Sequence, residues 1–306
     1  MKILDIFFPY RTYRRLIVST LGRFCLGSTK IRPRLVAQNW ELFGKYRRRK
    51  FECNICGASG FPLFDFPDLQ LRRDHHIGYL RETLQCKACG ATMRHRALAT
   101  ILLRSLSRRT ARNFRLIRDV DATALNDIRI LDTDAFSPIS RLLKDLPGYF
   151  ISSFRPDIPF NTEIEPQHIN VNLERMGFPD CSFDIVLTSD VMEHVRDIES
   201  AHSEVSRILK PGGQYIFTVP YDPSNSAHRI LVDTSGDRDI FLVPPHYHGD
   251  PLTGGILAYR VFGQQIFKDM MGLGLPTDLF LLNDRESLIE DGDVFVASKP
   301  ISDVKQ

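Results

Sequence analysis

The sequence predicts an α/β protein whose main sheet is mostly parallel and closed by an antiparallel hairpin, with a small four-cysteine module before it. Two observations support this. From about residue 119, short β-rich runs alternate with helical ones, and two C-x-x-C-G units stand close together before that point. We divide the 306-residue chain into a basic arm at 1–50, a cysteine module with a linking helix at 51–118, and an α/β domain at 119–306 that carries an inserted loop at 221–259.

The composition is that of an ordinary globular chain, with 43% hydrophobic and 25% charged residues. No apolar run approaches the roughly 20 residues that a membrane-spanning helix needs. The first residues show no small-residue cleavage site after their short apolar patch. We therefore expect a soluble cytoplasmic protein and exclude integral membrane, collagenous and disordered classes.

The basic arm differs sharply in charge from the rest of the chain. Residues 1–50 contain 13 Lys and Arg but only Asp5 and Glu41, a net charge of +11, whereas the remainder carries −8. One interpretation is a helix that docks on the body. A second is contact with an anionic membrane at its inner face, and nucleic acid is a weaker third.

The two cysteine pairs predict a metal site. In each pair the two-residue gap lets both sulfurs of one turn face the same ion, and the following glycine permits the turn. Two such units supply the four thiolates of a closed structural Zn²⁺ site, the geometry of a zinc ribbon. Two disulfides or a redox dithiol are the alternatives, and a reducing compartment disfavours disulfides. The predicted ligands are Cys53, Cys56, Cys86 and Cys89. Cys25 and Cys181 are expected to be buried thiols.

An amphipathic helix is expected directly after the second cysteine pair, because Leu98, Leu102 and Leu106 recur at helical spacing. Its first turn carries Arg94, His95 and Arg96. These charges either solvate the helix and cover the metal site or bind an anionic group of a substrate, and the first interpretation is favoured.

The α/β domain is expected to contain five parallel strands with helices between them. Ser137 and Pro138 should begin the first helix. The expected strands are 128–132, 148–153, 168–173, 183–190 and 214–220; further helices are expected at 190–209 and 261–271, and a closing hairpin at 279–282 and 293–298. Ligands of such sheets bind at the carboxyl ends of the strands.

Two segments of this domain carry a family resemblance. F-P-D-C-S-F-D-I-V-L-T-S-D-V-M-E-H-V at 178–195 and E-V-S-R-I-L-K-P-G-G-Q-Y-I-F-T-V-P at 204–220 resemble the class I S-adenosylmethionine-dependent methyltransferases. The resemblance covers about residues 128–220. The order of a four-cysteine module, R-H-R-A-L, this domain and P-H-Y-H-G-D-P-L at 245–252 resembles a bacterial subgroup of that superfamily. It implies the Rossmann-like methyltransferase fold, S-adenosyl-L-methionine as cofactor, and a small-molecule or glycan-type acceptor.

The resemblance also implies where the cofactor would bind, and here the sequence departs from the family pattern. Asp132 stands where the first strand ends in an acid, but Thr133 and the residues after it include none of the usual glycines. Ser153 replaces the acid that usually holds the ribose, and Asn172 stands near the adenine position. Asp190, at the end of the fourth strand, completes the cofactor set. Asp157, Glu163 or Glu165 could replace the missing ribose ligand.

Three histidines are candidate general bases for a hydroxyl acceptor. His194 follows the fourth strand, and His246 and His248 lie in the inserted loop. Imidazole titrates near neutrality and suits this role. For His194 a packed side chain is an equal interpretation, and for Asp190 and Glu193 the alternative is capping of the following helix. A metal held by the H-x-H segment and Asp250 is a further alternative.

Three functions remain open on this evidence. The first is a methyltransferase with a structural zinc module, acting on a small-molecule or glycan-type acceptor. The second is an RNA methyltransferase, because a zinc ribbon and a basic arm can read RNA. The third is a methyltransferase fold that no longer turns over and serves as a binding or scaffold protein, as the lost glycines and Ser153 suggest.

Overall fold

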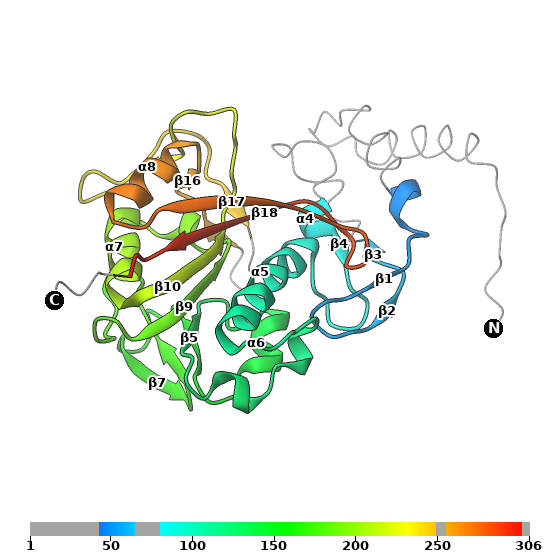
Figure 1. Ribbon diagram of the computed structural model, residues 1–306. Coiled ribbons are helices and arrows are strands. Elements are labelled where there is room, and N and C mark those ends of the chain that lie inside the picture. The colour runs from blue at the N-terminus through cyan, green and yellow to red at the C-terminus, as the bar shows by residue number, and fades with distance from the viewer. Residues whose placement is uncertain (1–42, 65–79, 249–254, 302–306) are drawn as a thin grey trace, which may run out of the picture.

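The computed structural model describes residues 43–64, 80–248 and 255–301. Its centre is an eight-stranded sheet in the order β17-β18-β10-β9-β5-β6-β8-β7 (Figure 1). Strands β5, β6, β8, β9 and β10 run parallel, while β7, β17 and β18 pair antiparallel with their neighbours. The predicted Rossmann-like architecture, a mostly parallel sheet with a closing antiparallel hairpin, is confirmed. The strands are β5 (Ile130–Asp132), β6 (Tyr149–Ser153), β7 (Thr162–Glu165), β8 (His168–Asn170), β9 (Phe183–Ser189), β10 (Leu209–Thr218), β17 (Thr277–Asp284) and β18 (Ile289–Ser298).

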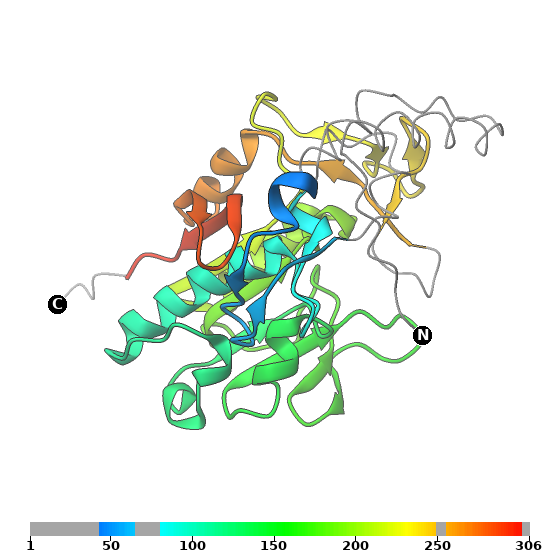
Figure 2. The same cartoon turned by 90° about the vertical axis from the view of Figure 1, so that its right-hand side faces the viewer.

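Alternate residues of the central strands face two separate cores, as the period of two requires. Ile185 and Leu187 point to the core that contains α5 (Met93–Thr110) and α6 (Pro138–Leu143). Val186, between them, points to the core under α7 (Ile198–Ile208) and α8 (Gln265–Gly272). Helices therefore cover both faces of the sheet, and Figure 2 shows α5 lying along one of them.

The cysteine module is built from short elements: β1 (Phe51–Glu52), β2 (Ser59–Gly60), β3 (Leu63–Phe64), α4 (Leu80–Thr83) and β4 (Leu84–Gln85). Its described residues form no core separate from that of the sheet. Phe51, Cys53 and Leu84 belong to the same buried cluster as α5 and the sheet residue Ile216. Module and sheet therefore share one hydrophobic interior.

The linking helix forms as predicted, and its N-cap is unusual. Thr92 Oγ1 accepts from the His95 amide at 3.4 Å, and the His95 ring lies 3.2 Å from the Thr92 amide nitrogen, so a histidine takes the place of the usual Glu in a capping box. The helix runs from the carboxyl edge of the sheet, where Arg94 reaches Ser189, to the amino edge, where Arg109 donates to the Gly212 carbonyl. The next helix begins with Ser137 as N-cap, as expected.

The expected helix at 190–209 is wrong at its start. Asp190 has a φ of +53°, in the left-handed region, so a right-handed helix cannot begin there. A 3₁₀ turn, η3 (Met192–His194), follows, and α7 starts only after Asp197, whose carboxylate accepts from the Ser200 amide at 3.0 Å. Asp190 and Glu193 are therefore not its caps. Strand β7 was not predicted at all, and Cys181, expected to be buried, is exposed.

The inserted segment folds into three short strand pairs of its own, with a minor core around Leu231, Val232 and Ala258. Its strands are β11 (Arg229–Ile230), β12 (Val232–Asp233), β13 (Ile240–Phe241), β14 (Tyr247–His248), β15 (Ile256–Leu257) and β16 (Arg260–Val261). Two further 3₁₀ turns, η1 (Ile117–Asp119) and η2 (Ala122–Leu125), connect α5 to β5. Within the described residues, no helix has both the length and the apolar character needed to cross a bilayer.

Candidate functional site

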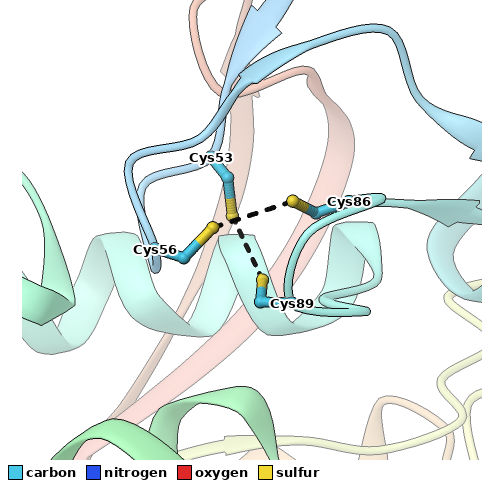
Figure 3. Close-up of side chains that lie close together, drawn as sticks. All are labelled: Cys53, Cys56, Cys86 and Cys89. Atoms are coloured by element: carbon cyan, nitrogen blue, oxygen red, sulfur yellow. Dashed lines mark hydrogen bonds between the residues drawn. The ribbon is translucent and has the colours of Figure 1, made fainter.

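The four predicted cysteine ligands lie in the two turns that follow β1 and β4, and their sulfurs point toward one another (Figure 3). Their sulfurs all lie within 4.8 Å of one another, with 3.7 Å between Cys53 and Cys89 and 3.8 Å between Cys56 and Cys86. None of the four forms a disulfide. Thiolates at about 2.3 Å from a tetrahedral Zn²⁺ are separated by about 3.8 Å, so the spacing fits a metal tetrahedron.

The glycines after each pair act as the sequence predicts. Gly57 and Gly90 have φ values of +71° and +75°, and each donates its amide to the carbonyl of the first cysteine in its unit, at 2.7 and 2.8 Å. A side chain at Gly57 would collide with the Arg118 guanidinium. Both turns therefore require glycine, and their closure points the two sulfurs inward.

The three charged residues that open α5 have three different roles. Arg96 is fully buried and donates to four backbone carbonyls, which tie the second cysteine turn to the tip of the β17–β18 hairpin. His95 caps the helix. Arg94 extends away from the cysteines to the end of β9, where it donates to Ser189. The first two fit the favoured structural interpretation, whereas Arg94 belongs to the carboxyl edge of the sheet.

A buried ion network occupies that edge. Arg81, 8% exposed, forms a two-pronged pair with Asp190 (Nη2 to Oδ1 is 2.8 Å) and donates to Asp293 at 3.1 Å. Arg94 pairs with both oxygens of Glu82, at 2.6 and 3.0 Å. Burial alone would raise the pKa of Asp190, but the two arginines outweigh it and hold that pKa below its usual range. The network was not predicted, because Arg81 and Asp190 are 109 residues apart and no sequence pattern joins them.

Asp132, predicted to contact a cofactor, is held by internal hydrogen bonds. It is 2% exposed and accepts from Tyr149 Oη at 2.5 Å, Ser140 Oγ at 2.7 Å and the Asp134 amide at 2.9 Å. Burial, reinforced by the Asp134 charge, raises the pKa of Asp132 to about 7. Beside it, the buried Thr133 hydroxyl has no hydrogen-bond partner among the described residues.

Ser153 ends β6 beside Asn170, the last residue of β8, and Asn172 follows two residues later. The Val171 amide donates to the Ser153 carbonyl at 2.9 Å. The Ser153 hydroxyl lies 2.8 Å from His168 Nε2, and Asn172 Oδ1 accepts from the Glu174 amide at 2.9 Å. The suggested substitute acids have other contacts. Asp157 pairs with Arg155, and Glu163 accepts from the Gln167 amide. The parallel strands thus bring Asp132, Ser153, Asn172 and Asp190 to one edge of the sheet.

His194 lies in η3 and is covered by the inserted segment. Its Nδ1 lies 2.8 Å from the Leu257 carbonyl, and its Nε2 lies 3.7 Å from Glu193 Oε1. A carbonyl oxygen only accepts, so Nδ1 carries the proton and Nε2 the lone pair. Burial lowers the pKa of His194. Glu193 is fully buried and its carboxyl oxygens have no hydrogen-bond partner in the described structure; burial raises its pKa well above the ordinary value.

The inserted segment brings His246 near His194 through the backbone. The Ala258 amide donates to the His246 carbonyl at 2.8 Å, next to the Leu257 carbonyl that His194 contacts. His248 lies in β14, where it pairs with Ile256. Asp250 lies outside the described residues. Arg260, missed in the sequence, donates to the carbonyls of Met192, Val195 and Arg196 and fixes the segment to η3.

Parts of the sequence are similar to known methyltransferases. Residues 145–217 match the family model described as "Methyltransferase domain". The chain is 37% identical over 69 residues to "Sterol 24-C-methyltransferase" of Yarrowia lipolytica, which covers 21% of this chain and 18% of that enzyme. It is 36% identical over 81 residues to "Uncharacterized protein YafE" of Escherichia coli, covering 26% and 39%. The chain therefore spans less than a fifth of the sterol relative and about two fifths of the second.

Solved structures show more extended but weaker similarity. One is the complex of the Haloferax volcanii Trm112 methyltransferase activator with a putative methyltransferase, at 17% identity, a TM-score of 0.40, and coverage of 68% of this chain and 91% of that one. Another is the Burkholderia thailandensis 1,6-didemethyltoxoflavin-N1-methyltransferase with bound S-adenosylhomocysteine, at 14% identity, a TM-score of 0.37, and coverage of 74% and 98%.

Proposed function

We propose that this chain, whose sheet has the fold of the class I S-adenosylmethionine-dependent methyltransferase superfamily, transfers a methyl group to a small-molecule or glycan-type acceptor. The observation that carries the proposal is the carboxyl edge of the sheet. Asp132 and Ser153 end two neighbouring strands and Asn172 follows the end of a third, within or beside the segment that matches the methyltransferase domain. In parallel sheets this edge is where ligands bind.

The residues at this edge fit S-adenosylmethionine in two places. The buried Thr133 hydroxyl lacks a partner in the described structure, and Asn172 keeps its amide nitrogen available while its oxygen holds a turn. These groups would hold the cofactor, which supplies an electrophilic methyl on its sulfonium. The chain's own contribution is then alignment of the acceptor and removal of its proton.

His194 is suited to that proton transfer. The Leu257 carbonyl fixes the Nδ1–H tautomer, and burial keeps the ring neutral at pH 7, so Nε2 can accept a proton from an acceptor hydroxyl. His246 and His248, on the segment that covers this region, complete the proposed catalytic set. The segment follows β10, so it also lies where it can contact the acceptor.

The cysteine module is proposed to bind a structural Zn²⁺ through Cys53, Cys56, Cys86 and Cys89. Four thiolates close the coordination sphere and leave no position for a reacting water. The module would instead contribute to the site at the sheet edge through Arg81 and Arg94. These two arginines hold Asp190 in place and keep its carboxylate ionised.

Calorimetric titration of the zinc-loaded full-length chain with S-adenosylmethionine and S-adenosylhomocysteine tests the proposal. We expect micromolar dissociation constants, which correspond to about −8 kcal/mol. Asn172→Ala should weaken binding about tenfold, the value of a hydrogen bond worth about 1.4 kcal/mol. Asn126→Ala, which changes an exposed asparagine in a distant loop, should leave it unchanged.

A second candidate function is that of a binding or scaffold protein. Several specific contacts favour it, because Asp132, Ser153 and Asp190 already have protein partners at the positions where a cofactor would need them. The same titration separates the two functions. Folded protein that binds neither ligand at millimolar concentration would overturn the enzyme in favour of the scaffold.

For the basic arm we propose contact with an anionic membrane surface through residues 1–42, which contain eight basic and two acidic side chains. Residues 43–50, the last part of the arm, pack on the body of the protein instead. Tyr46 is fully buried, and Lys45 and Arg49 pair with Glu290 at 3.2 and 2.9 Å, so this part docks on the hairpin. Deletion of 1–42 should abolish sedimentation with anionic liposomes, and unchanged sedimentation would refute the membrane contact.

A further inference from the structure

A cleft of about 620 Å³ lies beside α5, far from the carboxyl edge of the sheet. Its walls come from α5, the segment that follows it, β1 and the turn between β17 and β18. The volume falls within the range of small-molecule sites. The cleft begins at Thr100 and extends past Arg104, which is ten residues, or about 15 Å along the helix, from Arg94. It is therefore separate from the proposed methyl-transfer site.

One wall of the cleft carries two unpaired cations. Arg104 and Arg108 are both exposed, and neither has an ion pair or side-chain hydrogen bond in the described part of the chain. Four residues apart on one helix, they project on the same side. Other arginines nearby are engaged, since Arg109 bonds the Gly212 carbonyl and Arg115 pairs with Glu286. Two guanidinium groups at this spacing suit the oxygens of a phosphate.

The other wall offers hydrogen-bond acceptors. Asn54 lines the cleft, is 6% exposed, and donates its amide nitrogen to the Arg96 carbonyl at 2.8 Å and Thr100 Oγ1 at 2.9 Å. Its Oδ1 has no partner among the described residues. Four acidic residues also line the cleft: Glu52, Asp119, Asp284 and Glu286. Glu286 pairs with Arg115 and Asp119 with Arg118, so Glu52 and Asp284 are the carboxylates without an ion pair in the described part of the chain. Hydroxyl groups of a ligand would donate to such acceptors, whereas a second phosphate would be repelled by the carboxylates.

We propose that this cleft is a binding site for a phosphorylated polyol, with the phosphate between Arg104 and Arg108 and the hydroxyls toward Asn54 and Glu52. The arginines on one wall and the acceptors on the other together favour a ligand that carries both a phosphate and hydroxyl groups. A purely anionic ligand would leave Asn54 unsatisfied and approach the carboxylates, and a neutral polyol would make no use of the arginines. The site recognises a ligand but contains no group placed for chemistry on it.

Calorimetry with three probes tests the assignment: glucose 6-phosphate, glucose and inorganic phosphate, each titrated into the full-length zinc-loaded chain. We expect saturable binding of glucose 6-phosphate at submillimolar concentration, and binding of the other two at least about tenfold weaker, because each contacts only one wall. Raising the salt concentration should weaken glucose 6-phosphate binding, because the arginines are exposed.

The double variant Arg104→Ala/Arg108→Ala should reduce glucose 6-phosphate affinity about tenfold or more. Arg175→Ala, which removes an exposed arginine outside the cleft, is the matched control and should bind like the parent. S-adenosylmethionine affinity should be the same in all three proteins. Two results would overturn the proposal: no saturable binding of glucose 6-phosphate up to 10 mM (about −2.7 kcal/mol), or equal binding by the double variant and the parent.

Discussion

Two regions contact the chain at and just after the end of β9, and they are built in opposite ways. The cysteine module shares its core with the sheet and sends Arg81 and Arg94 into a buried ion network. Among its described residues, the inserted segment has a minor core of three buried side chains, and it is held to η3 by backbone hydrogen bonds and Arg260. It also leaves large apolar side chains exposed, among them Ile240 at 60% and Leu242 at 56%. The module therefore acts as part of the fold, whereas the segment is an attachment that can change without it.

Loss of a cysteine ligand should have the largest effect. Cys86→Ala removes one thiolate from the proposed site, and because the module has no core of its own, the sheet should lose stability with it. We expect loss of bound zinc and destabilisation of at least about 5 kcal/mol, given that structural zinc contributes about 10–16 kcal/mol to small domains. Metal analysis and urea unfolding measure both quantities. Cys181→Ala, which removes an exposed thiol, should change neither quantity. If Cys86→Ala loses its metal but the sheet keeps its stability, the module is not an integral part of the fold.

The next largest effect should come from Arg81→Ala. This change removes the arginine that pairs with Asp190 and Asp293 at a buried position, which typically costs about 3–5 kcal/mol, although Asp190 keeps its contacts with Thr218 and Arg94. Urea unfolding of the full chain gives the value. Arg175→Ala should stay within about 0.5 kcal/mol. If Arg81→Ala leaves the free energy of unfolding unchanged, the contact between the module and the end of β9 does not stabilise the fold.

Arg260→Ala should have a smaller and more local effect. Three carbonyls of η3 and the residues after it lose a donor, at about 1–3 kcal/mol. Hydrogen exchange should therefore accelerate within 229–261 and remain slow in β9 and α5. Equal acceleration in the sheet would show that the inserted segment is as integral as the module.

The pH dependence of stability should reveal Glu193, which lies where the two regions meet. Its folded-state pKa is raised above the ordinary 4.5, so its contribution to stability is fully present below about pH 4.5 and is lost as the pH rises toward the folded pKa. Glu193→Gln, which cannot ionise, should remove this loss and gain about 1 kcal/mol relative to the parent at neutral pH. Unfolding curves at pH 5 and pH 8 supply the test, and a gain confined to pH 5 would contradict it.

Surface changes on the inserted segment should have the smallest effect on stability. Phe241→Ser removes a side chain that is 46% exposed, and we expect a change within about 0.5 kcal/mol. The same substitution at Phe262, which is 1% exposed where the segment rejoins the sheet, should cost about 3–5 kcal/mol. Thermal unfolding of both variants measures the contrast. A similar loss of stability in the two variants would show that Phe241 is as well packed as a core residue.

Sequence reasoning succeeded where local pattern decides the structure. The C-x-x-C-G turns, the amphipathic linking helix and the N-cap at Ser137 depend on residues within a few positions of one another, and all three formed as predicted. It failed where distant residues decide. The Arg81–Asp190 pair spans 109 positions, and the same environment holds Asp190 in a left-handed conformation that delays the next helix. Strand β7 was not predicted because T-E-I-E is short and contains a single apolar residue, Ile164.

The length of α5 has a consequence for how this chain can vary. One continuous helix places Arg94 against Ser189, Arg96 among four carbonyls, and Arg109 against Gly212 at the opposite edge of the sheet. A single inserted residue would turn everything after it by about 100° and advance it by about 1.5 Å, so one of these attachments would always be lost. Insertions and deletions should therefore accumulate among relatives in the turn at 234–239, while the spacing from Arg94 to Arg109 stays at fifteen residues.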